Sequence, residues 1–234
     1  MKKNKILAFW CRQDWEGFLM GFISVVLGIV ITFGGEAWIS SNREKNNVKD
    51  VLILVRDELN SNIEVMDDIN DNLQLENRAA LYLMQYYDNF EACSMDSMKL
   101  YCNAPLTTLS SKPSQDALEL LKTSALLPKV KDKSLMLDII KAYNQLQIEQ
   151  DNINFYFSKK EKLIDRAMQE EAKALFARQH FTPAEMWTAI TSTDEGRHFL
   201  HEISISVAFG FGHEETKQYL QQIVAKLDEY IAEQ

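Results

Sequence analysis

The stretch that decides the fold, residues 48–73, reads VKDVLILVRDELNSNIEVMDDINDNL. Its large apolar side chains recur at alternating steps of four and three residues, the period of a helix with one buried face. The positions on this seam are Val48, Leu52, Val55, Leu59, Asn62, Met66, Ile69 and Leu73. Two interpretations stay open: a coiled coil between chains, in which Asn62 fixes the register, or a stripe packed inside the chain's own bundle.

The distribution of glycine extends the helical prediction to the rest of the chain. Five of the 8 glycines lie at or before residue 35, and none lies between Gly35 and Gly196. Hairpin turns favour residues with positive φ, mostly glycine or asparagine. The sequence therefore predicts an all-α fold.

Upstream of the seam, residues 17–35 read GFLMGFISVVLGIVITFGG and contain no charged side chain. At about 1.5 Å per residue, a helix of this length spans roughly 28 Å, close to the hydrocarbon thickness of a bilayer. Trp15 and Trp38 flank the run, as indole rings do at membrane interfaces. A cleaved signal peptide and a buried core helix are the competing interpretations. The long apolar core and the poor cleavage site favour a retained transmembrane helix over residues 17–38.

One face of this predicted span is lined with small residues at helical spacing. They are Gly17, Gly21, Ser24, Gly28 and Gly35. In lipid, such a stripe lets two helix backbones approach closely and gain packing contacts. We predict that it forms, together with Asn62, an interface with a second copy or with a membrane partner. Ordinary glycine enrichment in membrane helices is the alternative interpretation.

The net charge of −9 is concentrated in the residues that follow the span. A negative surface repels the phosphate backbone, so nucleic acid is not an expected partner. The basic residues near the span are Lys2, Lys3, Lys5 and Arg12 before it, and Arg43, Lys45 and Lys49 after it. The positive-inside rule then predicts a cytoplasmic tail at 1–16 and a main domain at 39–234 in the periplasm, at a bacterial inner membrane.

The main domain is predicted to be an antiparallel bundle of long, coiled-coil-like helices that continue from the membrane helix. Helical character reaches about residue 90, and a loop is expected over about 91–113. A short helix over 115–126, capped by Ser114, precedes a long helix over 133–178. The sequence from Thr182 to Glu185, with Pro183 after a Thr cap, predicts another helix start. Two further helices are expected over 194–209 and 214–233.

The residues capable of metal or redox chemistry are few. Cys93 and Cys102 lie in the predicted loop, either as a disulfide in an oxidising compartment or as two unrelated thiols. Glu195 and His198 form one Glu-x-x-His pattern, and His201 follows three residues later on the same predicted helix. Helical bundles that bind two metal ions need two such motifs. We therefore expect no metal and no other cofactor. Since no nucleophile elbow or phosphate-binding loop occurs, we do not expect an enzyme.

Two segments of the chain resemble a known family. Residues 25–31, VVLGIVI, followed by Gly35-Glu36-Ala37-Trp38, are similar to the start of a group of uncharacterised bacterial single-pass proteins, classed as domains of unknown function. Residues 114–143, with Asp116-Ala117-Leu118 and Lys131-Asp132-Lys133, are similar to the family's second recurring segment. The family's common Ser-Ser-Gly is Thr123-Ser124-Ala125 here, and many members carry a Glu where this chain has Phe22. The resemblance implies a membrane-anchored helical architecture. It implies no particular activity, because the family has no established one.

These observations predict a membrane-anchored helical interaction or scaffold module. It would self-associate or dock a membrane partner through its span and the helix that follows. A ligand-sensing extracytoplasmic domain that signals through a partner is the alternative, and a metal-dependent enzyme is the third hypothesis.

Overall fold

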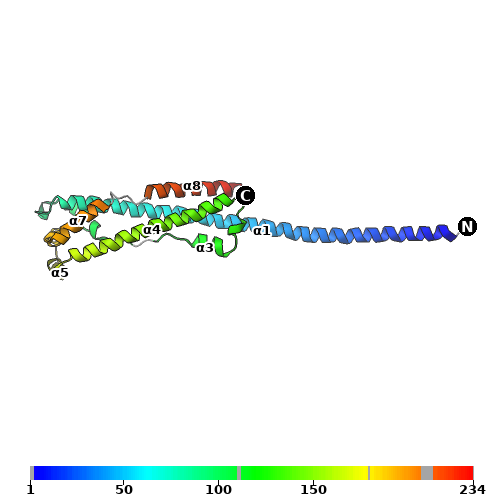
Figure 1. Ribbon diagram of the computed structural model, residues 1–234, viewed down its shortest axis with the longest axis horizontal. Helices are drawn as coiled ribbons and strands as arrows, with labels where there is room; N and C mark the ends of the chain where they lie inside the picture. The colour runs from blue at the N-terminus through cyan, green and yellow to red at the C-terminus, as the bar shows by residue number, and fades with distance from the viewer. Residues whose placement is uncertain (1–2, 110–111, 179, 207–212, 234) are drawn as a thin grey trace. The chain divides into compact units, whose positions relative to one another are not determined.

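The computed structural model describes residues 3–109, 112–178, 180–206 and 213–233, with side chains in the first helix described at 20–32, at 36 and from 39 onward. Within these residues every regular element is a helix and no strand occurs, which confirms the all-α prediction (Figure 1). The chain divides into two compact units, Met1–Asp50 with Gln234, and Val51–Glu233. The first helix, α1 (Lys3–Met84), contributes residues to both units.

The first unit is the N-terminal part of α1. Glycines at 17, 21, 28, 34 and 35 do not interrupt the helix. Every described side chain from residue 20 to residue 32 is exposed. Across the described part of the chain, no helix combines the length and the apolar character that crossing a membrane requires.

The segment predicted as a loop over 91–113 contains helical turns. Residues Phe90–Ala92 form the 3-10 turn η1, Met95–Tyr101 form α2, and Ala104–Leu106 form the 3-10 turn η2. The Ser94 hydroxyl caps α2 by accepting a hydrogen bond from the Ser97 N–H. Buried Met98 anchors α2 to the core, which explains how so short a helix persists.

The predicted short helix is shorter than expected: α3 is Asp116–Thr123, and the 3-10 turn η3 (Leu127–Lys129) follows it. Gln115, not Ser114, occupies the N-cap position of α3. Ala125 ends the turn with φ 56°, a left-handed conformation that favours glycine.

The long helix predicted over 133–178 is two helices, α4 (Lys133–Ala167) and α5 (Glu170–Phe176). The Asp132 carboxylate caps α4 by accepting from the N–H groups of Ser134 and Leu135. The chain turns at Met168 because Ala172 and Leu175 are then buried in the same core cluster as Ala167. Neither glycine nor proline marks this break, so periodicity alone missed it.

The last three helices follow the sequence signals closely. The predicted capping box is confirmed at α6 (Pro183–Thr191), where the Thr182 and Glu185 side chains each accept from the other residue's backbone N–H. The next helices are α7 (Asp194–Ser206) and α8 (His213–Ala232). The expected end of the 194–209 helix falls partly outside the described residues.

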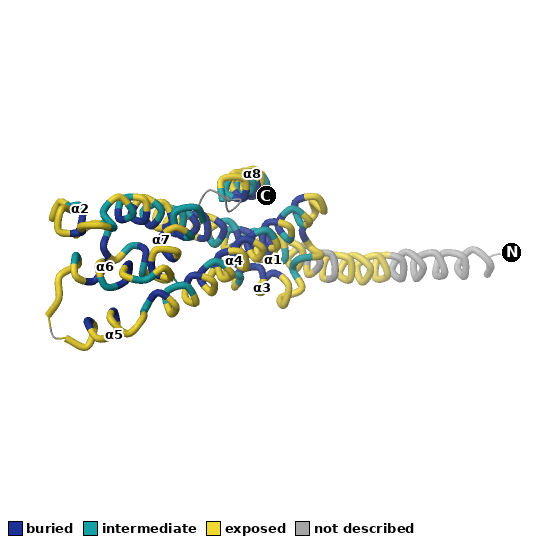
Figure 2. The backbone as a smooth tube through the Cα atoms, turned by 60° about the vertical axis from the view of Figure 1, so that its left-hand side comes forward, coloured by how far each residue is buried: buried dark blue, intermediate teal, exposed yellow. Residues whose placement is uncertain are grey.

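The seam of α1 is buried inside the chain's own second unit. From Leu52 to Leu73 every seam position is at least nine-tenths buried, and the helices that cover α1 belong to the same unit (Figure 2). Of the two interpretations left open by the sequence, the structure therefore shows the packing within one bundle.

A second core cluster lies at the end of this unit that contains α5, α6 and α7. Trp187, Phe199 and Leu200 are fully buried there, and the Trp187 indole N–H donates to the Cys102 carbonyl at 3.1 Å. Gly196 brings α7 against α6 so closely that a Cβ at this position would lie 1.7 Å from the Ile190 carbonyl oxygen. Only glycine permits this approach.

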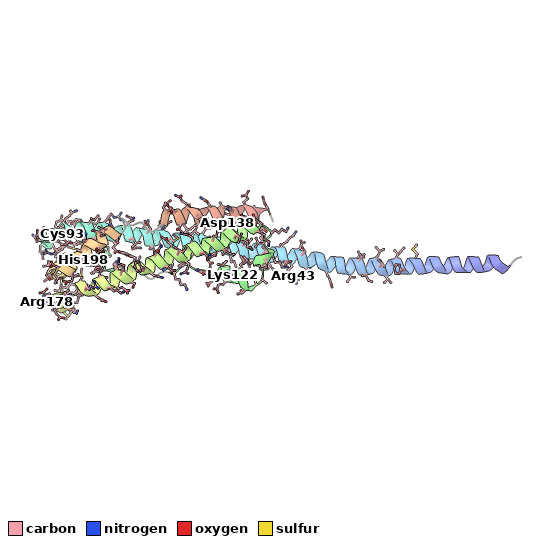
Figure 3. The ribbon with its side chains drawn as sticks, viewed as in Figure 1. Arg43, Cys93, Lys122, Asp138, Arg178 and His198 are labelled. Atoms are coloured by element: carbon pink, nitrogen blue, oxygen red, sulfur yellow. The ribbon has the colours of Figure 1, made fainter. Side chains whose placement is uncertain are left out.

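Ion pairs attach α8 to its neighbours. Lys226 reaches Asp138 on α4 at 2.5 Å, and Figure 3 labels Asp138. Lys217 reaches Asp67 on α1 at 2.8 Å, and Arg56 reaches Asp228 at 3.1 Å. These pairs are partly exposed, so each contributes little to the stability of the fold. The apolar stripe of Leu220, Ile223, Leu227 and Ile231 holds α8 in place.

Candidate functional site

The first candidate site is the apolar surface of α1 between residues 20 and 32, which Figure 2 colours as exposed. Met20 and Ile31 are each 71% exposed, and the other large side chains of the segment are at least 40% exposed. Contiguous apolar surface of this kind marks a binding or membrane surface in natural proteins.

The small residues of this segment leave the helix backbone accessible. A Cβ built on Gly21 or Gly28 meets nothing within 4 Å. The Ser24 hydroxyl donates to the Met20 carbonyl at 2.8 Å, and Thr32 donates to the Gly28 carbonyl at the same distance. Each hydroxyl is therefore satisfied within its own helix and needs no water, as polar groups in a hydrocarbon environment require. Gly17 and Gly35, the other predicted interface residues, lie outside the described side chains.

Asn62, the remaining predicted interface residue, is committed to its own chain. Its side-chain amide donates to the Ser114 carbonyl and its oxygen accepts from the Ser114 N–H, both at 2.9 Å. Neighbouring Glu58 accepts from the Ser114 hydroxyl, from the Ala117 N–H and from Tyr143. The buried Asn62 thus fixes the segment before α3 against α1.

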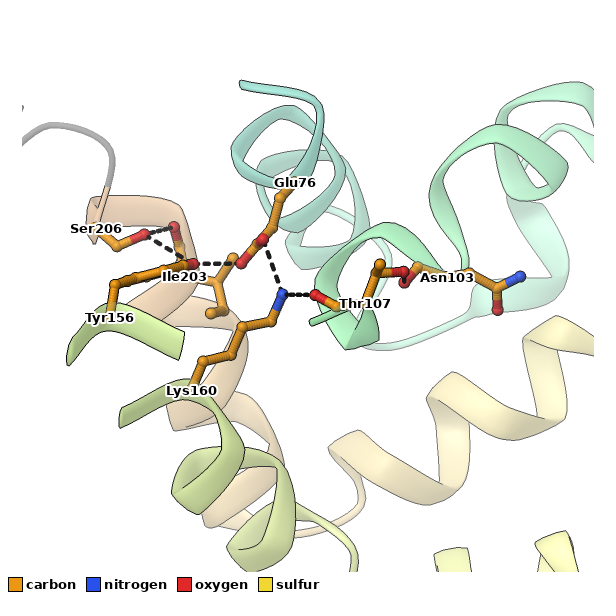
Figure 4. Close-up of polar contacts among 7 residues, drawn as sticks. All are labelled: Glu76, Asn103, Thr107, Tyr156, Lys160, Ile203 and Ser206. Carbon is orange, nitrogen blue, oxygen red and sulfur yellow. Dashed lines mark hydrogen bonds and ion pairs between the residues drawn. The ribbon is translucent and has the colours of Figure 1, made fainter. Parts of the chain in front are cut away.

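The second candidate site is a buried polar cluster between α1, α4 and the segment after η2 (Figure 4). The Lys160 ammonium is fully buried and lies 2.8 Å from the Glu76 carboxylate. It also donates to the Thr107 carbonyl, while the Tyr156 hydroxyl donates to the other Glu76 oxygen. The Ser206 hydroxyl lies 3.4 Å from that of Tyr156. The cluster joins four segments that are far apart in sequence.

Burial dominates the electrostatics of this cluster. Desolvation raises the pKa of Glu76 despite the opposing effect of Lys160, and it lowers the pKa of Lys160 despite that of Glu76. Burial and the Glu76 charge together raise the pKa of Tyr156. Each partner therefore offsets part of the cost of burying the other charge, and removing one member leaves the other buried and unpaired.

Sequence reasoning missed this cluster, although a signal was present. Glu76 lies three residues after Leu73, so it continues the seam of α1 at a buried position. Lys160 continues the stripe of α4 in the same way, three residues after Phe157. Two opposite charges at core positions of two predicted neighbouring helices indicate a buried ion pair.

A pocket of about 200 Å³ adjoins the cluster. It is lined by Asn72, Leu75, Glu76, Leu100, Asn103, Ala104, Thr107 and Leu109. Pockets that hold small-molecule ligands usually measure about 300–1,000 Å³. Since Glu76 is already paired and the pocket is small, the cluster's geometry supports a structural role better than ligand binding.

Cys93 and Cys102 are both free thiols in the structure. The helix α2 (Met95–Tyr101) lies between them. Its 7 residues advance the chain by roughly 10 Å at about 1.5 Å per residue, farther than the ~7 Å between Cα atoms that a disulfide tolerates. Burial raises the pKa of both thiols, which makes them less reactive.

The weak metal candidates lie on the outside of α7. Glu195, His198 and His201 are all exposed, and the His198 imidazole is 4.0 Å from Glu202 (Figure 3 labels His198). In the part of the chain that the structure describes, no three His, Cys, Asp or Glu side chains are grouped closely enough to hold a metal ion. The structure does not bring these residues together into a site.

No protein-family model matches the chain, and no significant match was found among curated proteins or solved structures. The resemblance drawn from residues 25–38 and 114–143 therefore stays a prediction.

Proposed function

We propose that the protein is a membrane-anchored helical interaction module that self-associates, or docks the span of a membrane partner, through the small-residue face of α1. The observation that carries this proposal is the run of exposed apolar side chains from residue 20 to residue 32. Left in water, this surface costs about 25 cal/mol for each Å² of apolar area. A bilayer removes that cost.

The proposed anchor, residues 17–38, is longer than the part whose side chains are described, because it also includes residues 17–19, 33–35 and 37–38. The hydroxyls of Ser24 and Thr32, bonded to carbonyls of their own helix, are compatible with hydrocarbon. The four basic residues before the run and the three after it favour a cytoplasmic N-terminus. We accordingly place the second unit in the periplasm, at a bacterial inner membrane.

Within lipid, apolar surface alone does not drive helices together, because lipid tails are as apolar as leucine. Close packing does. The open space around Gly21 and Gly28 lets a second helix approach the backbone of α1 there. We therefore propose this face, and not the bulky face opposite, as the intramembrane interface.

The test is the double substitution Gly21→Leu, Gly28→Leu in the full-length chain, purified in detergent. Two leucines on the small-residue face prevent close approach, so we expect the dissociation constant of the assembly to rise at least tenfold. Val26 and Val30 lie on the opposite face, about 140° and 180° around the helix from Gly21 at about 100° per residue. Val26→Leu, Val30→Leu is therefore the matched control, and it should leave the assembly intact. A glycine variant as oligomeric as its parent contradicts the proposal.

A further inference from the structure

The first two turns of α8, residues 213–219, are attached to the bundle mainly by polar contacts. The apolar stripe of α8 begins after them, at Leu220. Within these turns Thr216 is the only buried residue, and its hydroxyl accepts from the Gln145 amide of α4 at 3.1 Å. Because polar contacts stabilise less than apolar burial does, we expect this part of α8 to open more readily than the rest of the helix.

Charged side chains from α1, α4 and α8 gather at these two turns. The His213 imidazole lies 3.2 Å from the Asp67 carboxylate of α1, and the Lys217 ammonium lies 2.8 Å from the same carboxylate. The contribution of α4 is Glu149, which is only 3% exposed and lies within the electrostatic range of His213. Among the described residues, none forms a hydrogen bond with the Oε1 atom of Glu149.

Negative charge exceeds positive charge in this cluster. Lys217 is bound to both carboxylate oxygens of Asp67, so it does not neutralise Glu149. The other charged side chains that act on Lys217, Asp71 of α1 and Glu214 of α8, are negative as well. A proton bound by Glu149 would therefore remove a buried negative charge that no cation compensates.

We infer that Glu149 is a proton switch for the attachment of α8. With a proton on Glu149, residues 213–219 stay closed against α1 and α4, and without it they open. In the closed arrangement the ionised carboxylate is buried without a full set of partners, whereas water solvates it after α8 has moved away. Opening is thus coupled to release of a proton. The switch lies wholly within the second unit and is independent of the membrane interface proposed above.

The sign of the pH dependence follows from the groups around Glu149. Burial raises the pKa of Glu149, so the closed arrangement keeps the proton to a higher pH than the open one, and a fall in pH favours closure.

The neighbouring groups do not reverse this direction. The hydrogen bond between Lys217 and Asp67 lowers the pKa of Asp67 and raises that of Lys217, so both stay charged between pH 5 and pH 8. Histidine side chains gain positive charge as the pH falls through this range. A positive His213 between Asp67 and Glu149 also favours closure.

The experiment is amide hydrogen exchange of the full-length chain in detergent, corrected at each pH for the intrinsic exchange rate. One coupled proton changes the opening equilibrium by at most tenfold per pH unit. We expect the protection of residues 213–219 to be roughly tenfold higher at pH 5 than at pH 8. Residues 220–232, which contain the apolar stripe, serve as the internal reference and should change little.

Two uncharged variants test whether Glu149 is the switch. Glu149→Gln and Glu149→Met cannot ionise, so both should protect residues 213–219 at pH 8 as strongly as the parent does at pH 5. Glu161→Gln removes an exposed carboxylate from the same helix, and this matched control should keep the parental pH profile. Exchange over residues 220–232 verifies that each variant is folded.

A parent whose corrected protection at residues 213–219 does not change between pH 5 and pH 8 would overturn the switch. So would folded Glu149→Gln and Glu149→Met variants that keep the parental pH dependence or are less protected than the parent at pH 8.

Discussion

Replacing Lys160 with methionine lowers the free energy of unfolding of the second unit by about 3–5 kcal/mol, the usual cost of leaving a buried charge without its partner. Methionine fills a similar volume, so the loss comes from Glu76 and not from a cavity. The measurement is urea unfolding of the full-length chain in detergent, followed by circular dichroism at neutral pH. The double variant Glu76→Gln, Lys160→Met removes both charges and keeps an acceptor for Tyr156, so it should recover most of the loss. The account is contradicted if the double variant loses as much unfolding free energy as Glu76→Gln and Lys160→Met lose separately, added together.

The destabilisation by Lys160→Met also depends on pH, in a direction set by Glu76. Burial raises the pKa of Glu76, and loss of the neighbouring ammonium raises it further. A carboxyl whose pKa is higher in the folded state than in the unfolded state binds its proton more tightly in the folded state. The variant therefore regains stability as the pH falls from 8 towards 5. Over the same range, the difference in unfolding free energy between the variant and the parent becomes smaller.

Gly196→Ala lowers the free energy of unfolding by about 2–4 kcal/mol, because the added methyl group meets backbone atoms that have no room to move. The new Cβ would lie 1.7 Å from the Ile190 carbonyl oxygen and 2.6 Å from the carbonyl carbon. Relief requires α7 to separate from α6, which opens the core around Trp187 and Phe199. Thermal unfolding measures the effect.

Gly28→Ala is the matched control for this prediction. It adds the same methyl group to a helix, but at a position where a Cβ meets nothing within 4 Å. Unfolding of the second unit should be unchanged within about 0.5 kcal/mol. A Gly196→Ala variant as stable as this control would show that α6 and α7 are not packed as closely as described here.

The helical class was predictable because two independent features of the sequence indicate it. Glycine is absent between Gly35 and Gly196, and the apolar seam that begins at Val48 has the period of a helix. The helix start after Thr182 was equally clear, because a capping side chain marks it. These signals are local, so a single sequence contains them completely.

Features that depend on tertiary contacts were harder to predict from the sequence. The break at Met168 carries no local signal, since it exists only because Ala172 and Leu175 reach the core by turning there. The seam of α1 has the same pattern whether it packs on its own bundle or on another chain, so the role of Asn62 required its partner Ser114 to be known. Likewise, Glu76 and Lys160 each carry a buried-position signal, but their pairing depends on how α1 and α4 are aligned.

The central claim, a membrane-anchored module that assembles through its helices, is tested most directly by native mass determination of the full-length chain extracted from its source membrane in mild detergent. The account predicts that the chain is found in the membrane fraction and has the mass of a discrete homo-oligomer or of a stoichiometric complex with a membrane partner. A chain recovered from the soluble fraction, or a membrane-extracted chain with the mass of a monomer, would contradict it.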